Sequence, residues 1–262
     1  MKEPKGEIRS VGKAMELLEL FFAWRKPMSL QQLAEATQYP KSTVHSLLAT
    51  LREYGVVMQE ESGRYYLGAR LYEYGCAAAA SWDAAALARP RLEHLAEKLG
   101  ASAFISLMEN GYVISFDRCT PHSGSGYQIF PEVGTRLPLH ATAQGKILLS
   151  TLSDAQVLRL LKRYGMAQFT PHTLTDPERF LAQLERIRTQ GYAVEDGEYK
   201  IGLRTVAAPV CDYTGAVKYA LGVVGLFRRI DSAEFRRAIE LTVAQAKLLS
   251  ADLRYRPEPN GK

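Results

Sequence analysis

Cysteine is scarce in this chain, and its three residues form no recognisable pattern. Cys76, Cys119 and Cys211 lie far apart, their number is odd, and no two of them are spaced as CxxC. This spacing argues against a disulfide framework and against a four-ligand zinc site. It predicts reduced thiols, as in a cytoplasmic protein.

Long apolar segments are also missing. The longest strongly apolar run, residues 219–227, is far too short to span a bilayer. Residues 15–24 are apolar but are interrupted by Glu16 and Glu19, so they predict an amphipathic helix rather than a signal peptide. We therefore expect a cytoplasmic protein with no membrane partner.

Signatures of catalysis are absent as well. The chain contains no GxSxG, HExxH, GxGxxG or GxxxxGK[ST] pattern. Glu195, Asp196 and Glu198 could serve a hydrolase, but a carboxylate cluster at a strand end is more often solvated. Cys119 and His122 have no third ligand nearby. We predict no catalytic residue, no metal and no cofactor. The alternative is a small-molecule enzyme, or a ligand sensor with an N-terminal protein-binding module.

The charge is balanced rather than strongly basic. The formal net charge is +5, with 33 Lys and Arg against 28 Asp and Glu, and the hydrophobic content is 47%. The length fits one large globular domain or two ordinary ones. Residues 1–75 hold ten basic and nine acidic side chains. The net charge is compatible with nucleic-acid binding but does not show which segment would bind. The segment must be found from the residue pattern.

The N-terminal region predicts three helices. Ser10 can cap the first, and Ser29 and Gln32 stand at capping-box spacing for the second. Pro40 suits the first position of the third. The apolar residues of the first helix recur at helical spacing, at Val11, Met15, Leu18 and Phe22.

The third helix has two contrasting faces. Its core face carries Val44, Leu47, Leu48 and Leu51. The opposite face carries short hydrogen-bonding or cationic side chains, at Lys41, Ser42, Thr43, His45, Ser46 and Thr50. Such side chains can enter a major groove, and two short helices joined by a short link are helix-turn-helix geometry. The alternative is a three-helix module that uses this face for protein contacts.

A hairpin is expected behind this helix. Residues 56–58 and 64–67 are strand-like and flank a turn at residues 60–63. A hairpin in this position is a wing, with Arg64 near its tip able to touch a DNA backbone. The pattern therefore predicts a winged helix-turn-helix over residues 8–70.

An alanine-rich connector follows, at residues 71–87. Its strong helix formers predict a linker helix, with a possible restart at Asp83. Small residues permit close helix approach, so the helix could pack against a second subunit. An ordinary helix within one domain is the alternative.

Residues 88–255 predict an α+β domain with an antiparallel sheet covered by helices. Strand-like segments at 101–108 and 112–118 flank Asn110-Gly111, a strong hairpin signal. Further strands are expected at 192–195, 205–210 and 216–225. Helices are expected up to Gly100, over 147–152, after Ser153, over 177–190 and over 232–253.

The segment 141–145 enters a helix and consists of small or polar residues. Free N–H groups at such a turn could bind an anionic ligand. The pattern alone favours the simpler interpretation, in which Thr142 caps the helix.

Several segments of the chain together show a specific resemblance to a known family. Residues 39–51, 54–57 and 66–68 resemble the DNA-binding domain of the IclR (isocitrate lyase regulator) family. Residues 134–146, 190–198, 202–204 and 207–210 resemble its effector-binding domain. The resemblance covers nearly the whole chain in order. Ser46 departs from the arginine that the family usually has there, which affects the expected operator sequence more than the fold.

The resemblance implies a transcriptional regulator that binds double-stranded operator DNA and a small organic effector, as a homodimer or a dimer of dimers. It implies a GAF/profilin-like effector domain. The effector-binding positions that it implies are Ile129, Ala143, Gln144, Glu195, Thr205 and Gly222. Thr205 replaces a common cysteine, and Glu195 reaches further than the aspartate of other members. Neither repression nor activation follows from these residues.

Overall fold

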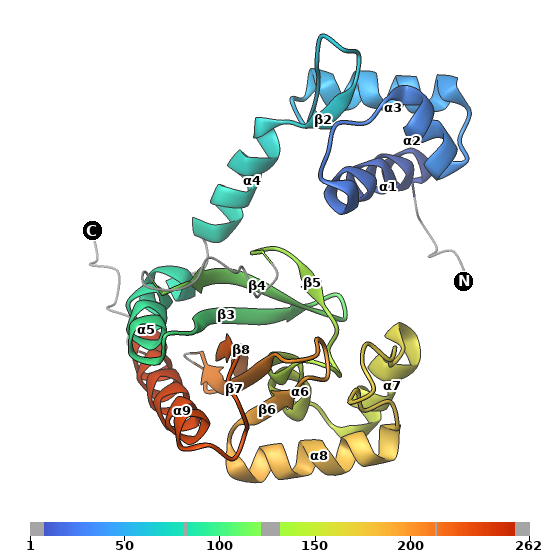
Figure 1. Ribbon diagram of the computed structural model, residues 1–262. Coiled ribbons are helices and arrows are strands. Elements are labelled where there is room, and N and C mark those ends of the chain that lie inside the picture. The colour runs from blue at the N-terminus through green and yellow to red at the C-terminus, as the bar shows by residue number, and fades with distance from the viewer. Residues whose placement is uncertain (1–7, 81–82, 122–131, 213, 255–262) are drawn as a thin grey trace. The chain divides into compact units, whose positions relative to one another are not determined.

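The computed structural model describes residues 8–80, 83–121, 132–212 and 214–254. The chain divides into two compact units, Met1–Trp82 and Asp83–Lys262. Each unit has its own hydrophobic core. The helices and the hairpin of the first unit, and the sheet of the second, are those of the expected two-domain fold class (Figure 1).

Three helices form the core of the first unit: α1 (Arg9–Trp24), α2 (Leu30–Thr37) and α3 (Lys41–Glu53). The capping box at α2 is confirmed, because the Ser29 hydroxyl accepts from Gln32 N and the Gln32 side chain accepts from Ser29 N. Two expected starts are wrong by one or two residues. Ile8, not Ser10, is the N-cap of α1, and Pro40 is the N-cap of α3 rather than its first residue.

Helix α1 buries a different face from the stripe that its sequence suggests. Leu17 and Phe21 point into the core. Val11, Met15 and Phe22 are exposed by 57%, 52% and 38%. A helix of this small unit needs only a narrow buried face, so the remaining apolar stripe is left on the surface.

The expected hairpin follows α3. Strands β1 (Val57–Gln59) and β2 (Tyr65–Leu67) pair antiparallel, with Val57 opposite Leu67. Met28 exchanges backbone hydrogen bonds of 2.7 and 2.8 Å with Tyr65, which ties the hairpin to the segment before α2. Helix α4 (Ala69–Ala80) follows. Residues 81–82 lie outside the described ranges.

The second unit is built on an antiparallel sheet with the strand order β5-β4-β3-β8-β7-β6. The strands are β3 (Ser102–Glu109), β4 (Tyr112–Cys119), β5 (Arg136–Leu137), β6 (Ala193–Asp196), β7 (Arg204–Cys211) and β8 (Val217–Gly225). Asn110 and Gly111 both have positive φ, so the predicted hairpin turn is confirmed. The short edge strand β5 was not predicted.

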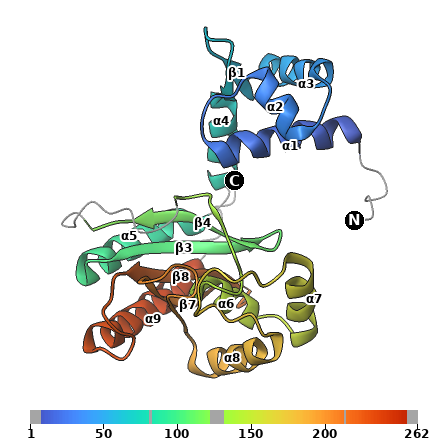
Figure 2. The ribbon, with the colours of Figure 1, turned by 45° about the vertical axis from the view of Figure 1, so that its right-hand side comes forward.

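Helices cover both faces of this sheet (Figures 1 and 2). Helices α5 (Asp83–Leu99) and α9 (Ala233–Arg254) pack on one face. Helices α6 (Ala143–Ser150) and α8 (Pro177–Gln190) lie on the other, and α7 (Asp154–Tyr164) packs beside α8. Two apolar clusters result, one on each face of the sheet.

Local signals place the ends of these helices well. Ser153 and Gln156 form a capping box at α7, Asp176 caps α8 before Pro177, and Gly191 ends α8 with φ 77°. Helix α6 starts four residues earlier than expected and ends at Ser150. None of the described helices is long and apolar enough to cross a membrane.

Candidate functional site

Helix α3 presents the predicted polar face to solvent. Its core side buries Val44 and Leu48 completely. The residues expected to meet DNA lie opposite: Lys41, Ser42, His45, Ser46 and Thr50 are exposed, and Thr43 is half-buried. A shallow hollow of about 390 Å³ is lined by Ser42, Thr43, Ser46, Leu47 and Thr50. The face is therefore free, polar and slightly concave.

Two hydroxyls of this face are held along the helix. Ser46 Oγ donates to the Ser42 carbonyl at 3.0 Å, and Thr50 Oγ1 donates to the Ser46 carbonyl at 3.1 Å. A hydroxyl that donates in this way still has lone pairs to accept with. Both side chains therefore lie in fixed rotamers close to the helix surface.

The hairpin is fastened to the same helix. Arg52 Nη1 on α3 donates to Gln59 Oε1 on β1 at 2.8 Å, and Gln59 Nε2 donates to the Gly63 carbonyl at 3.1 Å. Arg64 is exposed directly after this turn. The wing therefore carries an exposed cation on a hairpin that is bonded to α3.

In the second unit, a tight turn leads into α6. Thr142 Oγ1 accepts from Gly145 N at 3.2 Å and donates to the Pro138 carbonyl at 2.8 Å. The structural interpretation of Thr142 as a cap is thus confirmed. A Cβ on Gly145 would stand 2.2 Å from the Leu139 carbonyl oxygen, so only glycine lets the preceding segment pack this close. Ala143, the first residue of α6, is fully buried.

Gln144 is the most unusual polar residue of this helix. Its side chain is completely buried, and neither Oε1 nor Nε2 has a hydrogen-bond partner. Buried amides are nearly always satisfied, because an unpaired polar group in the interior is costly. An orphan amide beside a helix start is therefore a strong candidate for a ligand contact.

Two of the predicted site residues on the facing strands contact each other. Glu195 and Thr205 are directly paired between β6 and β7, and both are about 97% buried. Thr205 Oγ1 donates to Glu195 Oε2 at 2.9 Å, and Tyr199 N donates to Oε1 at 3.1 Å. Burial raises the pKa of the Glu195 carboxyl, while these two donors oppose the shift.

Gly222 lies on β8 opposite Phe104 and Ala207. A Cβ there would stand 2.5 Å from Phe104 Cζ, so the ring of Phe104 occupies the space above the glycine. This was not foreseen: the glycine makes room for a ring of the protein. Ile129, the expected apolar wall, lies outside the described residues.

The sequence analysis missed a buried ion pair beside this group. Lys146 on α6 is fully buried, and its Nζ binds Glu198 Oε1 and lies 3.5 Å from the Val194 carbonyl. The expectation of a solvated carboxylate cluster is therefore wrong for Glu195 and Glu198. Asp196 keeps 42% of its side chain exposed and pairs with Arg204 Nε at 2.7 Å.

Family models match both units. The IclR helix-turn-helix domain matches residues 10–61, and the C-terminal domain of the bacterial transcriptional regulator IclR matches residues 76–251. The chain belongs to the IclR family. The predicted resemblance is confirmed, and so is a winged helix-turn-helix in front of an effector-binding α+β domain.

Similar IclR-family proteins cover nearly the whole chain. The HTH-type transcriptional regulator XynR of Escherichia coli K12 is 32% identical over 249 residues, which are 95% of this chain and 98% of XynR. The crystal structure of an IclR regulator from Alicyclobacillus acidocaldarius has a TM-score of 0.81 at 29% identity, over 94% of this chain and 98% of that one. The chain is therefore a transcriptional regulator of the same two-part design.

A more distant relative carries a ligand. An IclR homologue from Microbacterium hydrocarbonoxydans, complexed with 4-hydroxybenzoate, has a TM-score of 0.81 at 22% identity, over 94% of this chain and 99% of that one. At this identity the likeness establishes the shared IclR-family fold alone.

The residues that sequence reasoning missed gave little local signal. Lys146 and Glu198 are 52 positions apart, and each looks like an ordinary surface residue in its own segment. The one available hint was that Lys146 directly precedes the apolar residues 147–149.

Proposed function

We propose that this IclR-family regulator reads its operator with the exposed face of α3 and steadies the complex with Arg64 of the wing. The contact residues are Lys41, Ser42, Thr43, His45, Ser46 and Thr50. The observation that carries this is the free, slightly concave polar face opposite a fully buried Val44 and Leu48. Short side chains that are held close to the helix suit base edges in a major groove.

The test uses an operator that the protein itself selects from a random duplex library. Thr43→Ala and His45→Ala should weaken selected sites more than random duplex, because base contacts provide specificity. Lys41→Ala should weaken both and lower the slope of affinity against salt, because it removes a phosphate contact. If Thr43→Ala lost the same affinity on every sequence, its base-reading role would be refuted.

We further propose that the effector binds on the α6 face of the sheet, at Ala143, Gln144, Glu195 and Thr205, beside the Phe104 ring that covers Gly222. The buried, unpaired amide of Gln144 supports this assignment most directly. A small organic acid with a hydroxyl group fits. The N-terminus of α6 favours the carboxylate, and Glu195 accepts from the hydroxyl. The 4-hydroxybenzoate of the distant relative has this combination of groups.

The experiment is calorimetry combined with operator titration, using a panel of hydroxylated organic acids that includes 4-hydroxybenzoate. Gln144→Leu should abolish binding of the active compound, and Thr205→Val should weaken it. A coupling of about 1–3 kcal/mol would shift operator affinity by 5–150-fold. If both variants bound that compound and released DNA as the wild type does, the site would lie elsewhere.

The regulator is proposed to act as a homodimer or a dimer of dimers. Two copies double the DNA contacts and call for a palindromic operator. The exposed apolar stripe of α1, at Val11, Met15 and Phe22, supports this proposal, because such a stripe on a small unit is typically covered by a partner.

A further inference from the structure

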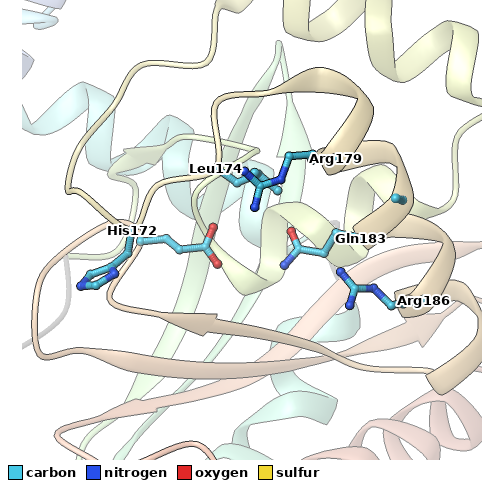
Figure 3. Close-up of a pocket in the computed structure, with 7 residues that line it drawn as sticks. His172, Leu174, Arg179, Gln183 and Arg186 are labelled. Carbon is cyan, nitrogen blue, oxygen red and sulfur yellow. The ribbon is translucent and has the colours of Figure 1, made fainter.

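A hollow of about 350 Å³ lies between helix α8 and the turn after β6, on residues that neither proposed site uses. Its helix side carries Arg179, Gln183 and Arg186, which recur every three or four residues and so share one face of α8. Figure 3 shows these three side chains extending from α8 toward the same space, with His172 on the opposite side. The volume suits a small molecule rather than a macromolecule.

The hollow has a surplus of positive charge. Among the described residues, the guanidinium groups of Arg179 and Arg186 make no salt bridge and no side-chain hydrogen bond. Glu185, the acid that directly precedes Arg186, is bound to Arg188. The two free guanidiniums are therefore available for bidentate binding of carboxylates.

Two residues that line the hollow carry buried acceptors that lack donors. Glu198 lines it, is 8% exposed, and has one oxygen, Oε1, bound by Lys146. Its other oxygen, Oε2, is buried without a partner, and so is Oε1 of Gln183. A buried acceptor without a donor is rare, and two at one hollow indicate a missing hydrogen-bond donor.

Both walls are held in place. Thr170 Oγ1 donates to the Gly197 carbonyl at 2.7 Å, and Thr173 Oγ1 donates to the Glu198 carbonyl at 2.6 Å. On the other side, Asp176 caps α8 through Arg179 N at 2.8 Å. Because these bonds fix the backbone on both sides, the orphan acceptors do not depend on a mobile surface loop.

We propose that this hollow is a second small-molecule site, and that it binds a hydroxylated dicarboxylate. The charges of Lys146 and Glu198 offset each other, so the positive charges of Arg179 and Arg186 remain and can be balanced by two carboxylates of a ligand. A carboxylate at neutral pH has no proton to donate, so the hydroxyl groups of the ligand must donate to Glu198 Oε2 and Gln183 Oε1. The two arginines of the lining distinguish this site from the effector site, which contains Glu195 and the ring of Phe104.

The test is calorimetry on the full chain with L-tartrate, and with succinate as the matched ligand that lacks the two hydroxyls. Tartrate should bind about tenfold more tightly than succinate, because only tartrate satisfies the orphan acceptors. Arg179→Gln and Arg186→Gln should each weaken tartrate by about tenfold or more. Arg159→Gln removes an exposed arginine from α7, outside the hollow, and should change nothing.

Four results would overturn the proposal. The first is that tartrate does not bind in the millimolar range. The second is that tartrate and succinate bind with equal affinity. The third is that the Arg159 control loses as much tartrate affinity as the α8 variants do. The fourth is loss of tartrate binding in Gln144→Leu with no loss in the α8 variants, which would move the ligand to the effector site. This test remains valid if the effector proposal fails, because the two tests use different variants and different ligands.

Discussion

Two buried carboxylates only three residues apart have different electrostatic surroundings. Glu198 is neutralised by the ammonium group of Lys146. Glu195 has no such contact and relies on the hydroxyl of Thr205 and the amide of Tyr199. Burial raises the pKa of Glu195, whereas burial lowers the pKa of Lys146 against the opposing effect of Glu198. Glu195 and the pair of Lys146 and Glu198 should therefore affect the free energy of unfolding in different ways.

Glu195 should make stability fall as pH rises. Since the folded protein holds this proton more tightly than the unfolded chain, unfolding free energy is lost from pH 4.5, the ordinary pKa, upward through the raised pKa. Urea denaturation of wild type and Glu195→Gln across this range should show a steeper fall in the wild type. Glu240→Gln, an exposed change on α9, is the control and should follow the wild type. Parallel curves for wild type and Glu195→Gln would contradict the argument.

The pair of Lys146 and Glu198 makes a second prediction. Lys146→Met leaves the Glu198 charge buried and unpaired, so it should cost about 3–5 kcal/mol of unfolding free energy. The double variant Lys146→Met, Glu198→Leu removes both charges and should recover most of that loss. Chemical denaturation of both variants and of Glu198→Leu alone completes a double-mutant cycle. Additive losses, with no recovery in the double variant, would mean that the two charges are not coupled.

At the scale of elements, local sequence signals predicted several helix starts, whereas contacts between distant segments could not be predicted from the sequence. Ser29, Ser153 and Asp176 begin their helices as predicted, because a cap depends on only a few neighbouring residues. The short strand β5 was missed, because two residues carry no recognisable strand pattern and are defined by pairing with β4. The burial of Glu195 and Glu198 was missed for a similar reason, since α6 and the loop at 170–173 cover them.

The entry into α6 gives a prediction at this scale. Gly145→Ala would place a Cβ 2.2 Å from the Leu139 carbonyl oxygen, a backbone atom that cannot simply move aside. We expect a loss of more than about 3 kcal/mol, as for other severe steric clashes in a core. Gly75→Ala in α4 meets nothing within 4 Å and should stabilise by about 0.5–1 kcal/mol. Thermal unfolding of the two variants checks this, and similar midpoints would contradict it.

At the scale of the whole molecule, the two-domain fold class followed from the sequence, but the strand order did not. The hairpin of β3 and β4 is local, whereas β3 also pairs with β8, with Ala103 opposite Val223. No pattern in either strand encodes that partner. The family resemblance, rather than the periodicity, brought Gln144, Glu195, Thr205 and Gly222 together before their shared sheet face was known.

The last prediction concerns assembly and rests on the exposed stripe of α1. Met15→Asp combined with Phe22→Asp would bring charges into an apolar contact, which is costly when the stripe is covered by a second copy. Sedimentation velocity should show a shift to monomer at micromolar concentration. Affinity for a full palindromic operator should fall by at least about tenfold, while a single half-site is bound as before. Leu158→Asp alters a leucine on α7 that is exposed by 42%, and it should leave both measurements unchanged. A variant that stays dimeric would exclude α1 as the interface, and a monomer that binds the full operator with wild-type affinity would exclude the need for a dimer.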